Sequence, residues 1–166
     1  MSLASQAYRE AGEAILANVN EIAQSWRDAV RADEAIAGDD RLPDLLLTNQ
    51  VPALLADIAQ ALKEGEEGGS PDRSIARRRR GLRFGKLRGL ARYDAGDLYR
   101  EFRHLRHTIW RFLRQRLDWH RGDAFEVMLA IDQLLDEVIG ASLRGYVEAS
   151  ERAAEREAPD KPDPQP

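Results

Sequence analysis

Apolar residues recur at spacings of three and four along most of the chain, which is the pattern of amphipathic helices. The first such segment predicts one long helix from about Ser5 to about Ala35. The apolar face of this helix consists of Tyr8, Ala11, Ile15, Val19, Ile22, Trp26 and Val30. The Gly38-Asp39-Asp40 cluster that follows is expected to end the helix, because these residue types favour turns.

A second helical region covers residues 42–63 and contains a proline. Pro52 lacks a backbone donor, so it predicts a kink or a fresh start. Thr48 and Asn49 in front of it carry capping side chains, which favours a short helix, a break and a new helix. The buried stripe of the new helix is Leu54, Leu55, Ile58, Ala61 and Leu62. The glycine-rich segment 65–71 is expected to be a loop.

The stretch from Asp72 to Leu90 is the least regular part of the pattern, because its apolar residues do not share one helical face. Gly81, Gly85 and Gly89 each weaken a helix by up to about 1 kcal/mol relative to alanine. A helix that ends at Arg80 and a looser turn after it are therefore expected. Glycines four residues apart can also let two helices approach closely.

Two more helices are predicted in the second half of the chain. Asp94 is a candidate N-cap for the first of them. Its apolar stripe is Leu98, Phe102, Leu105, Ile109, Phe112, Leu113 and, at the end, Leu117. The Arg121-Gly122-Asp123 segment is expected to break the chain, with Asp123 as the next cap. The last helix carries a stripe of Ala124, Met128, Ile131, Leu135 and Val138, which Val127, Leu134 and Ile139 widen.

The width of this last stripe suits the core of a bundle better than a two-stranded coiled coil. No β-hairpin signal and no alternating strand pattern is visible. The sequence therefore predicts an all-α fold of about five helices in one domain, residues 1–150. Residues 151–166 are charged and then rich in proline, so we expect a disordered tail or linker there.

The amino-acid composition and the missing motifs narrow the range of functions that the chain can have. The 166 residues include no cysteine, which excludes disulfides, thiol nucleophiles and cysteine-ligated metals. No signal peptide pattern and no run of about 20 apolar residues is present, so a cytoplasmic location is expected. We find no phosphate-binding loop, no nucleophile elbow and no His-Glu-x-x-His motif, and we therefore expect no catalytic residues, no cofactor and no metal.

The charge is distributed unevenly although the net charge is only −4. Residues 73–121 contain 16 Lys and Arg against 4 Asp and Glu, whereas the rest of the chain contains 9 against 25. This pattern favours self-neutralisation within one fold over binding of an acidic partner. Nucleic-acid binding by the basic stretch from Arg73 to Arg92 is the alternative, because Arg73, Arg77 and Arg80 would share one helical face.

Two histidines on the predicted helix after Asp94 have a spacing that could chelate a metal. His104 and His107, however, lie about 120° and 180° from the apolar stripe on a helix of 3.6 residues per turn. Both are therefore expected to face solvent, which argues against a metal and also against haem. A haem- or ligand-binding sensor globin is kept as an alternative function.

Glu101 lies at the border of the same stripe, beside Phe102. It is either solvated at the surface or buried, and a buried carboxylate needs a partner. The basic run over residues 77–83 supplies candidates. The second case would be a buried ion pair that holds the third predicted helix against the fourth.

Several of these features together resemble a known family. They are Trp26, the segment 45–62 with Pro52-Ala53-Leu54-Leu55, the Arg80-Gly81 dipeptide with Arg83, and the run Leu98-Tyr99-Arg100-Glu101-Phe102-Arg103-His104-Leu105-Arg106. Over about residues 10–150 the chain resembles the N-terminal sensory domain of the RsbR/RsbRD co-antagonists of the bacterial stressosome. The same domain type begins some histidine kinases. The family often has His-Gly where this chain has Arg80-Gly81, so any role of that histidine is lost.

The resemblance implies a globin-like helical fold without haem that acts as a homodimeric input module without catalysis. Its last helix would lead to a histidine kinase or STAS output domain. We therefore expect a signal-transduction input domain that binds partner proteins or a small signal and relays it through the last helix. The residues named as structural or interaction residues are Trp26, Arg80, Arg83, Glu101 and Arg106.

Overall fold

The structure is a computed structural model that describes residues 3–36, 44–65, 71–91, 93–117 and 121–157. These residues form six helices and no strand, which confirms the all-α prediction with one helix more than expected. The helices are α1 (Leu3–Ala17), α2 (Val19–Arg31), α3 (Asp44–Glu64), α4 (Pro71–Leu90), α5 (Ala95–Arg116) and α6 (Arg121–Glu157). The globin-like arrangement stays a prediction.

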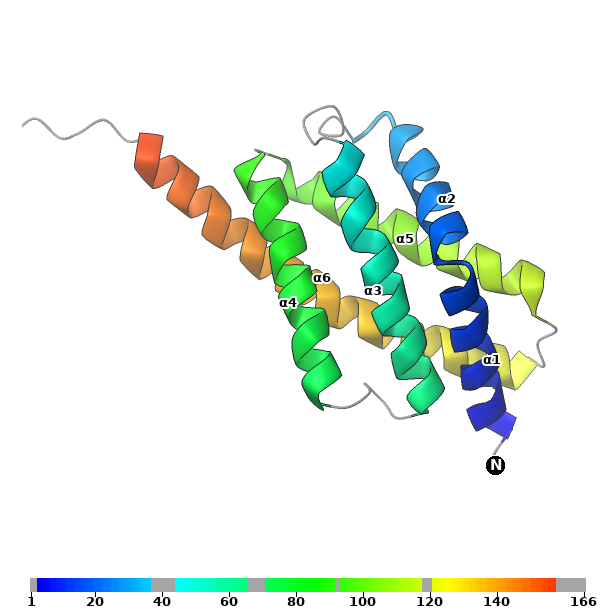
Figure 1. The fold of residues 1–166 in the computed structure, drawn as a ribbon. Helices are drawn as coiled ribbons and strands as arrows, with labels where there is room; N and C mark the ends of the chain where they lie inside the picture. Colours follow the sequence, from blue (N-terminus) through cyan, green and yellow to red (C-terminus); the bar gives the residue numbers. More distant parts are fainter. Residues whose placement is uncertain (1–2, 37–43, 66–70, 92, 118–120, 158–166) are drawn as a thin grey trace, which may run out of the picture.

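The helices form two crossed layers. The α1–α2 pair, α3 and α4 stand side by side in one layer, and α5 and α6 cross behind them (Figure 1). Between the layers lies one core to which all six helices contribute. Its largest fully buried apolar side chains are Ile15, Ile22, Trp26, Leu55, Ile58, Leu98, Phe102 and Leu105. None of the helices within the described ranges combines the length and the apolar composition of a membrane span.

The prediction of one long first helix is wrong, because the helix is interrupted at Asn18. The Asn18 side-chain nitrogen donates to the carbonyl of Ala14 at 2.8 Å, and its backbone nitrogen donates to Ile15 at 3.0 Å. The amide side chain thus takes the carbonyl that a continued helix would use. The predicted apolar face is nevertheless buried along both helices. α2 ends at Arg31, and the predicted stop at residues 38–40 lies outside the described residues.

The break predicted before Pro52 is also wrong, because α3 is continuous through this residue. Val51 and Leu55, on either side of the proline, are both fully buried. Burial of these side chains on one face compensates for the backbone hydrogen bond that proline removes. α3 ends where expected, at Glu64, and the Gly65 that follows has a φ of 66°, in the left-handed region that favours glycine. Pro71 already belongs to α4, in which it is the first residue.

The looser turn predicted after Arg80 is replaced by the second half of α4, which is helical to Leu90. The glycines of this half face α6 at very short range. A Cβ atom on Gly85 would lie 1.7 Å from the Ser142 carbonyl oxygen, and one on Gly81 would lie 2.7 Å from that of Val138. A Cβ on Gly145 of α6 would lie 2.1 Å from the Leu82 carbonyl oxygen. The expectation that these glycines bring two helices close together is confirmed.

The start of α5 is as predicted, since the Asp94 carboxylate accepts a hydrogen bond from the Gly96 backbone at 2.7 Å. The start of α6 differs from the prediction. The helix already begins at Arg121, so Asp123 lies in its first turn and is not its cap.

α6 also continues through residues 151–157, which the sequence analysis assigns to the tail, and residues 158–166 lie outside the described part of the chain.

Two glycine substitutions test the α4–α6 contact. Gly85→Ala should lower the free energy of unfolding by at least about 2 kcal/mol, because the new methyl group meets the backbone of α6. Gly140→Ala, in the interior of α6 with nothing within 4 Å of its Cβ, should raise it by about 0.5–1 kcal/mol. Urea unfolding measures both, and a Gly85→Ala protein as stable as Gly140→Ala would contradict the contact.

Candidate functional site

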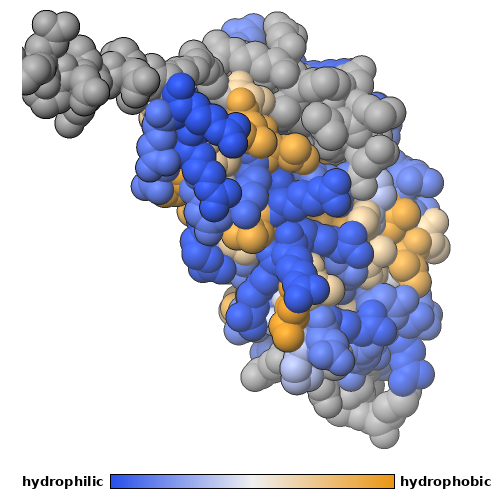
Figure 2. All heavy atoms as spheres, turned by 60° about the vertical axis from the view of Figure 1, so that its left-hand side comes forward, coloured by the Kyte–Doolittle hydropathy of each residue, from blue (hydrophilic) through white to orange (hydrophobic). Residues whose placement is uncertain are grey.

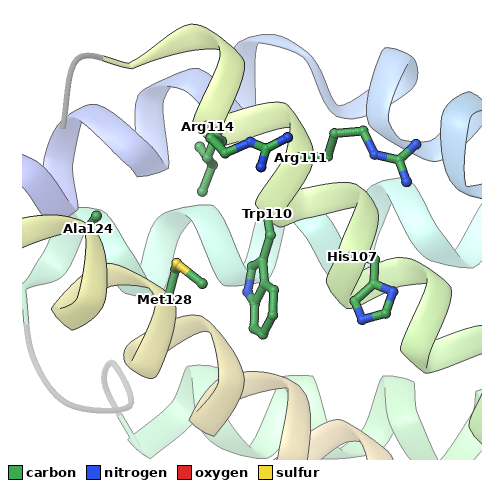
Figure 3. A pocket seen from close by; sticks show the side chains of 7 residues that line it. His107, Trp110, Arg111, Arg114, Ala124 and Met128 are labelled. Atoms are coloured by element: carbon green, nitrogen blue, oxygen red, sulfur yellow. The ribbon is translucent and has the colours of Figure 1, made fainter. Parts of the chain in front are cut away.

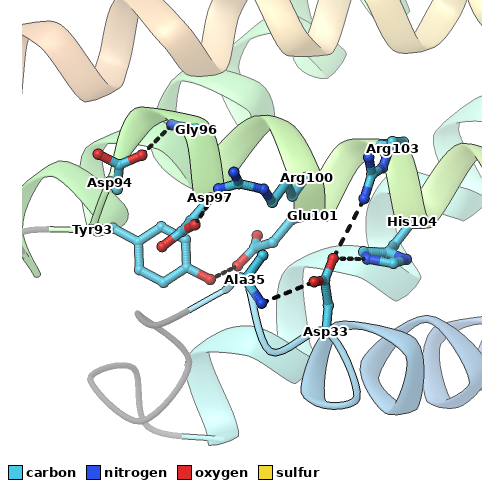
Figure 4. Close-up of polar contacts among 10 residues, drawn as sticks. All are labelled: Asp33, Ala35, Tyr93, Asp94, Gly96, Asp97, Arg100, Glu101, Arg103 and His104. Atoms are coloured by element: carbon cyan, nitrogen blue, oxygen red, sulfur yellow. Dashed lines mark hydrogen bonds and ion pairs between the residues drawn. The ribbon is translucent and has the colours of Figure 1, made fainter.

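Glu101 of α5 is a fully buried carboxylate at the centre of a polar network. Its Oε2 accepts a hydrogen bond from Arg88 Nε at 2.8 Å, and its Oε1 accepts one from the Tyr93 hydroxyl at 2.5 Å. The Trp26 indole nitrogen donates to the Glu101 main-chain carbonyl at 2.9 Å. Arg88, Tyr93 and Trp26 are each no more than 1% exposed. Figure 4 shows the Glu101 carboxylate meeting the Tyr93 hydroxyl.

The network reaches the last helix through Tyr146. The Tyr146 hydroxyl donates to the Tyr93 carbonyl at 2.7 Å, and the Tyr93 backbone nitrogen donates to the Arg88 carbonyl at 3.0 Å. We call Trp26, Arg88, Tyr93, Glu101 and Tyr146 the Glu101 network. It connects α2, α4, α5 and α6 through hydrogen bonds that are buried, except for the partly buried one from Tyr146.

Arg88 is accommodated in the core by aromatic neighbours. Its guanidinium carbon lies 3.3 Å from the centroid of the Phe84 ring, and its Nη1 donates to the Phe84 carbonyl at 3.2 Å. Phe84 in turn packs on Phe102 with ring centroids 5.0 Å apart. A cation held over an aromatic face keeps part of the stabilisation that water would supply.

The hypothesis of a buried ion pair at Glu101 between the third and fourth predicted helices is confirmed, but the partner is outside the run of residues 77–83. Arg88 was missed because the predicted helix ends at Arg80. A signal for it exists in the sequence. The buried positions of α4 recur at helical spacing, but three of them are glycines and two are arginines. They are Ser74, Arg77, Gly81, Phe84, Gly85, Arg88 and Gly89. A search for apolar residues alone does not detect this stripe, because most of its positions are glycine or arginine.

The other residues named from the sequence lie at the edges of the bundle. Arg80 is half exposed and pairs with Asp57 of α3 at 2.5 Å, and Arg83 is exposed on α4. Arg106 of α5 contacts α6, where it lies 3.1 Å from Asp132 and 2.7 Å from Asp136. Burial raises the pKa of Asp132, Arg106 lowers it and Asp136 raises it further. Of the five named residues, the structure brings only Trp26 and Glu101 together.

Three arginines that were considered for phosphate binding have carboxylate partners within the chain. Arg73 pairs with Glu64 at 2.6 Å, and Arg80 pairs with Asp57. Arg77 is fully buried and pairs with Glu137 at 2.9 Å. These contacts are the self-neutralisation that the charge distribution favours, and the burial of Arg77 means that Arg73, Arg77 and Arg80 do not form one exposed face.

The histidine prediction is correct for His107, which is exposed, and wrong for His104. His104 is half-buried, and its Nε2 lies 2.6 Å from the Asp33 carboxylate beyond the end of α2 (Figure 4). The hydrogen bond from His104, with a second one from the Ala35 backbone, lowers the pKa of Asp33 below its ordinary value of 3.8. The described residues contain no group of three or more His, Cys, Asp or Glu that could hold a metal ion.

The fold and this site define an all-helical domain in which buried charges pair with one another between helices. The family of the RsbT co-antagonist protein rsbRD N-terminal domain matches residues 20–159, and the chain belongs to this family. This confirms the resemblance noted in the sequence, and it indicates a sensory domain of stress signalling. Comparisons with curated proteins and with solved structures gave no significant match.

Removal of the Glu101 carboxylate tests the ion pair. Glu101→Ala should lower the free energy of unfolding by about 3–5 kcal/mol, because it leaves the Arg88 charge buried without a partner. The control is Arg116→Ala, which removes an ion pair with Glu21 in which both side chains are about half exposed. Arg116→Ala should lower the free energy of unfolding by less than about 1 kcal/mol. Thermal and urea unfolding measure both, and equal stabilities of the two variants would contradict the role of Glu101.

Proposed function

We propose that this chain is an input domain of bacterial stress signalling that acts in the cytoplasm, binds a partner protein or a small signal and relays it through α6. The observation that carries the proposal is the Glu101 network, because it joins the helices of the bundle to Tyr146 of α6. In this proposal the segment catalyses no reaction and holds no cofactor. The output is carried by a fused domain or a partner protein.

The geometry of α6 supports a relay. The helix has 37 residues and passes behind the whole bundle, and its C-terminal end projects beyond the core (Figure 1). Its C-terminal half packs on α4 mainly through small residues such as Ala141, Ser142 and Ala149. In addition to this close contact, a few hydrogen bonds join α6 to α4 and to the segment that follows α4. These are Ser142 to Gly81 at 2.9 Å and Tyr146 to Tyr93.

The surface around the end of α6 also fits this proposal. Figure 2 shows that the face turned forward on this side of the molecule is largely hydrophilic, with hydrophobic side chains in small separate patches. A helix end that is solvated can change its direction without exposing a large apolar area. This is what a relay to a following domain requires.

Spin labels test whether the Glu101 network controls α6. The chain has no cysteine, so cysteines at Asn20 of α2 and Glu155 of α6, both exposed, take labels specifically. Tyr146→Phe removes only the hydroxyl that bonds Tyr93, and it should shift or broaden the distance distribution measured by pulsed electron paramagnetic resonance. Tyr99→Phe, at an exposed tyrosine of α5, should leave it unchanged. Identical distributions for wild type and Tyr146→Phe would contradict the relay.

We further propose that the domain forms a homodimer through one face of α6. Four large apolar side chains on this helix are exposed, namely Phe125, Leu129, Leu143 and Val147. At 3.6 residues per turn they lie within about 40° of one another around the helix axis. Asp132 and Asp136 occupy the same face between them and are held by Arg106. A second copy would cover this apolar stripe, as twofold symmetric interfaces commonly do.

Light scattering tests the dimer. The wild-type chain should have twice the monomer mass at micromolar concentrations, and the double variant Leu129→Glu/Leu143→Glu should be monomeric. Tyr99→Glu places one negative charge on an exposed side chain of α5 away from the stripe, and it should remain dimeric. A wild-type protein that is strictly monomeric at high micromolar concentration would contradict the dimer.

A further inference from the structure

A cavity lies between the end of α5 and the start of α6, away from the Glu101 network. Its volume is about 550 Å³, which is within the range of small-molecule sites, about 300–1,000 Å³. The lining residues are His107, Trp110, Arg111, Leu113 and Arg114 of α5 and Ala124 and Met128 of α6. We propose that this cavity binds a small organic anion with an apolar body. We call it the α5–α6 pocket.

The walls of the α5–α6 pocket are apolar. In Figure 3 the Trp110 and His107 rings extend side by side from α5, and Met128 of α6 faces the indole. Leu113 and Ala124 complete the apolar lining. Walls of this kind favour an aliphatic or aromatic ligand body, because its burial removes apolar surface from water.

The polar groups of the pocket are hydrogen-bond donors. The Trp110 indole nitrogen is buried and has no hydrogen-bond partner among the described residues, and in Figure 3 it points toward Met128. A buried donor without a partner costs about 1–3 kcal/mol, which an acceptor atom of a ligand would recover once the atoms that cover the nitrogen move aside. This orphaned donor is the observation that distinguishes the cavity from an ordinary packing gap.

The charge of the pocket selects an anion. Two arginines, Arg111 and Arg114, line it, and no carboxylate of the described residues does. Arg73, Arg77 and Arg88 of α4 and Arg106 of α5 each have a carboxylate partner. Neither Arg111 nor Arg114 forms an ion pair with a carboxylate of the described residues. These two cations are therefore available for a carboxylate, which arginine binds through charge-assisted hydrogen bonds.

The position of the pocket connects it with α6. A ligand in it would contact both α5 and the first turns of α6, close to the Arg106 contacts with Asp132 and Asp136. Occupancy would thus alter the packing of α6 against the bundle. This assignment of the ligand as the signal rests on the relay proposed above, whereas the assignment of the pocket as a binding site does not.

Calorimetric titration with octanoate tests the pocket, and octylamine of the same chain length is the cationic control. Octanoate should bind saturably to the full chain and octylamine should not. Arg111→Ala/Arg114→Ala should weaken octanoate binding at least tenfold. Arg79→Ala/Arg144→Ala removes the same charge from exposed positions on α4 and α6 and should leave the affinity unchanged.

A second variant separates the pocket from the surface. Ala124→Phe fills the cavity and should abolish octanoate binding, with a helical circular dichroism spectrum like that of the wild type. Equal binding of octanoate and octylamine, or full affinity in Ala124→Phe, would overturn the site. Absence of octanoate binding would overturn the site and leave the relay untouched. Saturable binding that leaves the Asn20–Glu155 distance distribution unchanged would overturn the role of the pocket in signalling.

Discussion

The buried ion pair between Glu101 and Arg88 is the constraint on which the rest of the structure depends. Two charged groups taken out of water must satisfy each other in good geometry, because each alone would cost several kcal/mol. This requirement sets the position of α4 against α5, places Phe84 beneath the guanidinium and brings the Tyr93 hydroxyl to the carboxylate. Trp26 then attaches α2 to the same point through the Glu101 carbonyl.

The close contact of α4 with α6 is coupled to this ion pair. Arg88 lies between Gly85 and Gly89, the two glycines that face the α6 backbone at Ser142 and Tyr146. One stretch of α4 therefore holds the buried charge on one side and the last helix on another. In the relay that we propose, a change in either contact would be transmitted to the other through this helix.

Several charged residues of the fold are neutralised by ion pairs between helices. Four arginines of the stretch that looks like a nucleic-acid surface in the sequence, Arg73, Arg77, Arg80 and Arg88, meet a carboxylate of α3, α5 or α6 once the helices assemble. The end of α5 differs, because Arg111 and Arg114 lie there beside a cavity with apolar walls. The basic middle of the chain thus serves packing along α4 and, in our proposal, ligand binding at the end of α5.

The sequence by itself determined the all-α class, the buried faces of α1, α2, α3, α5 and α6, the cap at Asp94 and the family, and it raised a buried partner for Glu101 as one of two alternatives. These features depend on neighbours within a few residues, so local periodicity reveals them. Only the tertiary structure decided that α3 continues through Pro52, that α4 continues through its glycines and that Arg88 is the partner of Glu101. The cost of a proline, a glycine or a buried charge in a helix depends on the surface that another segment places against it. That surface comes from residues distant in the sequence, such as Ser142 for Gly85.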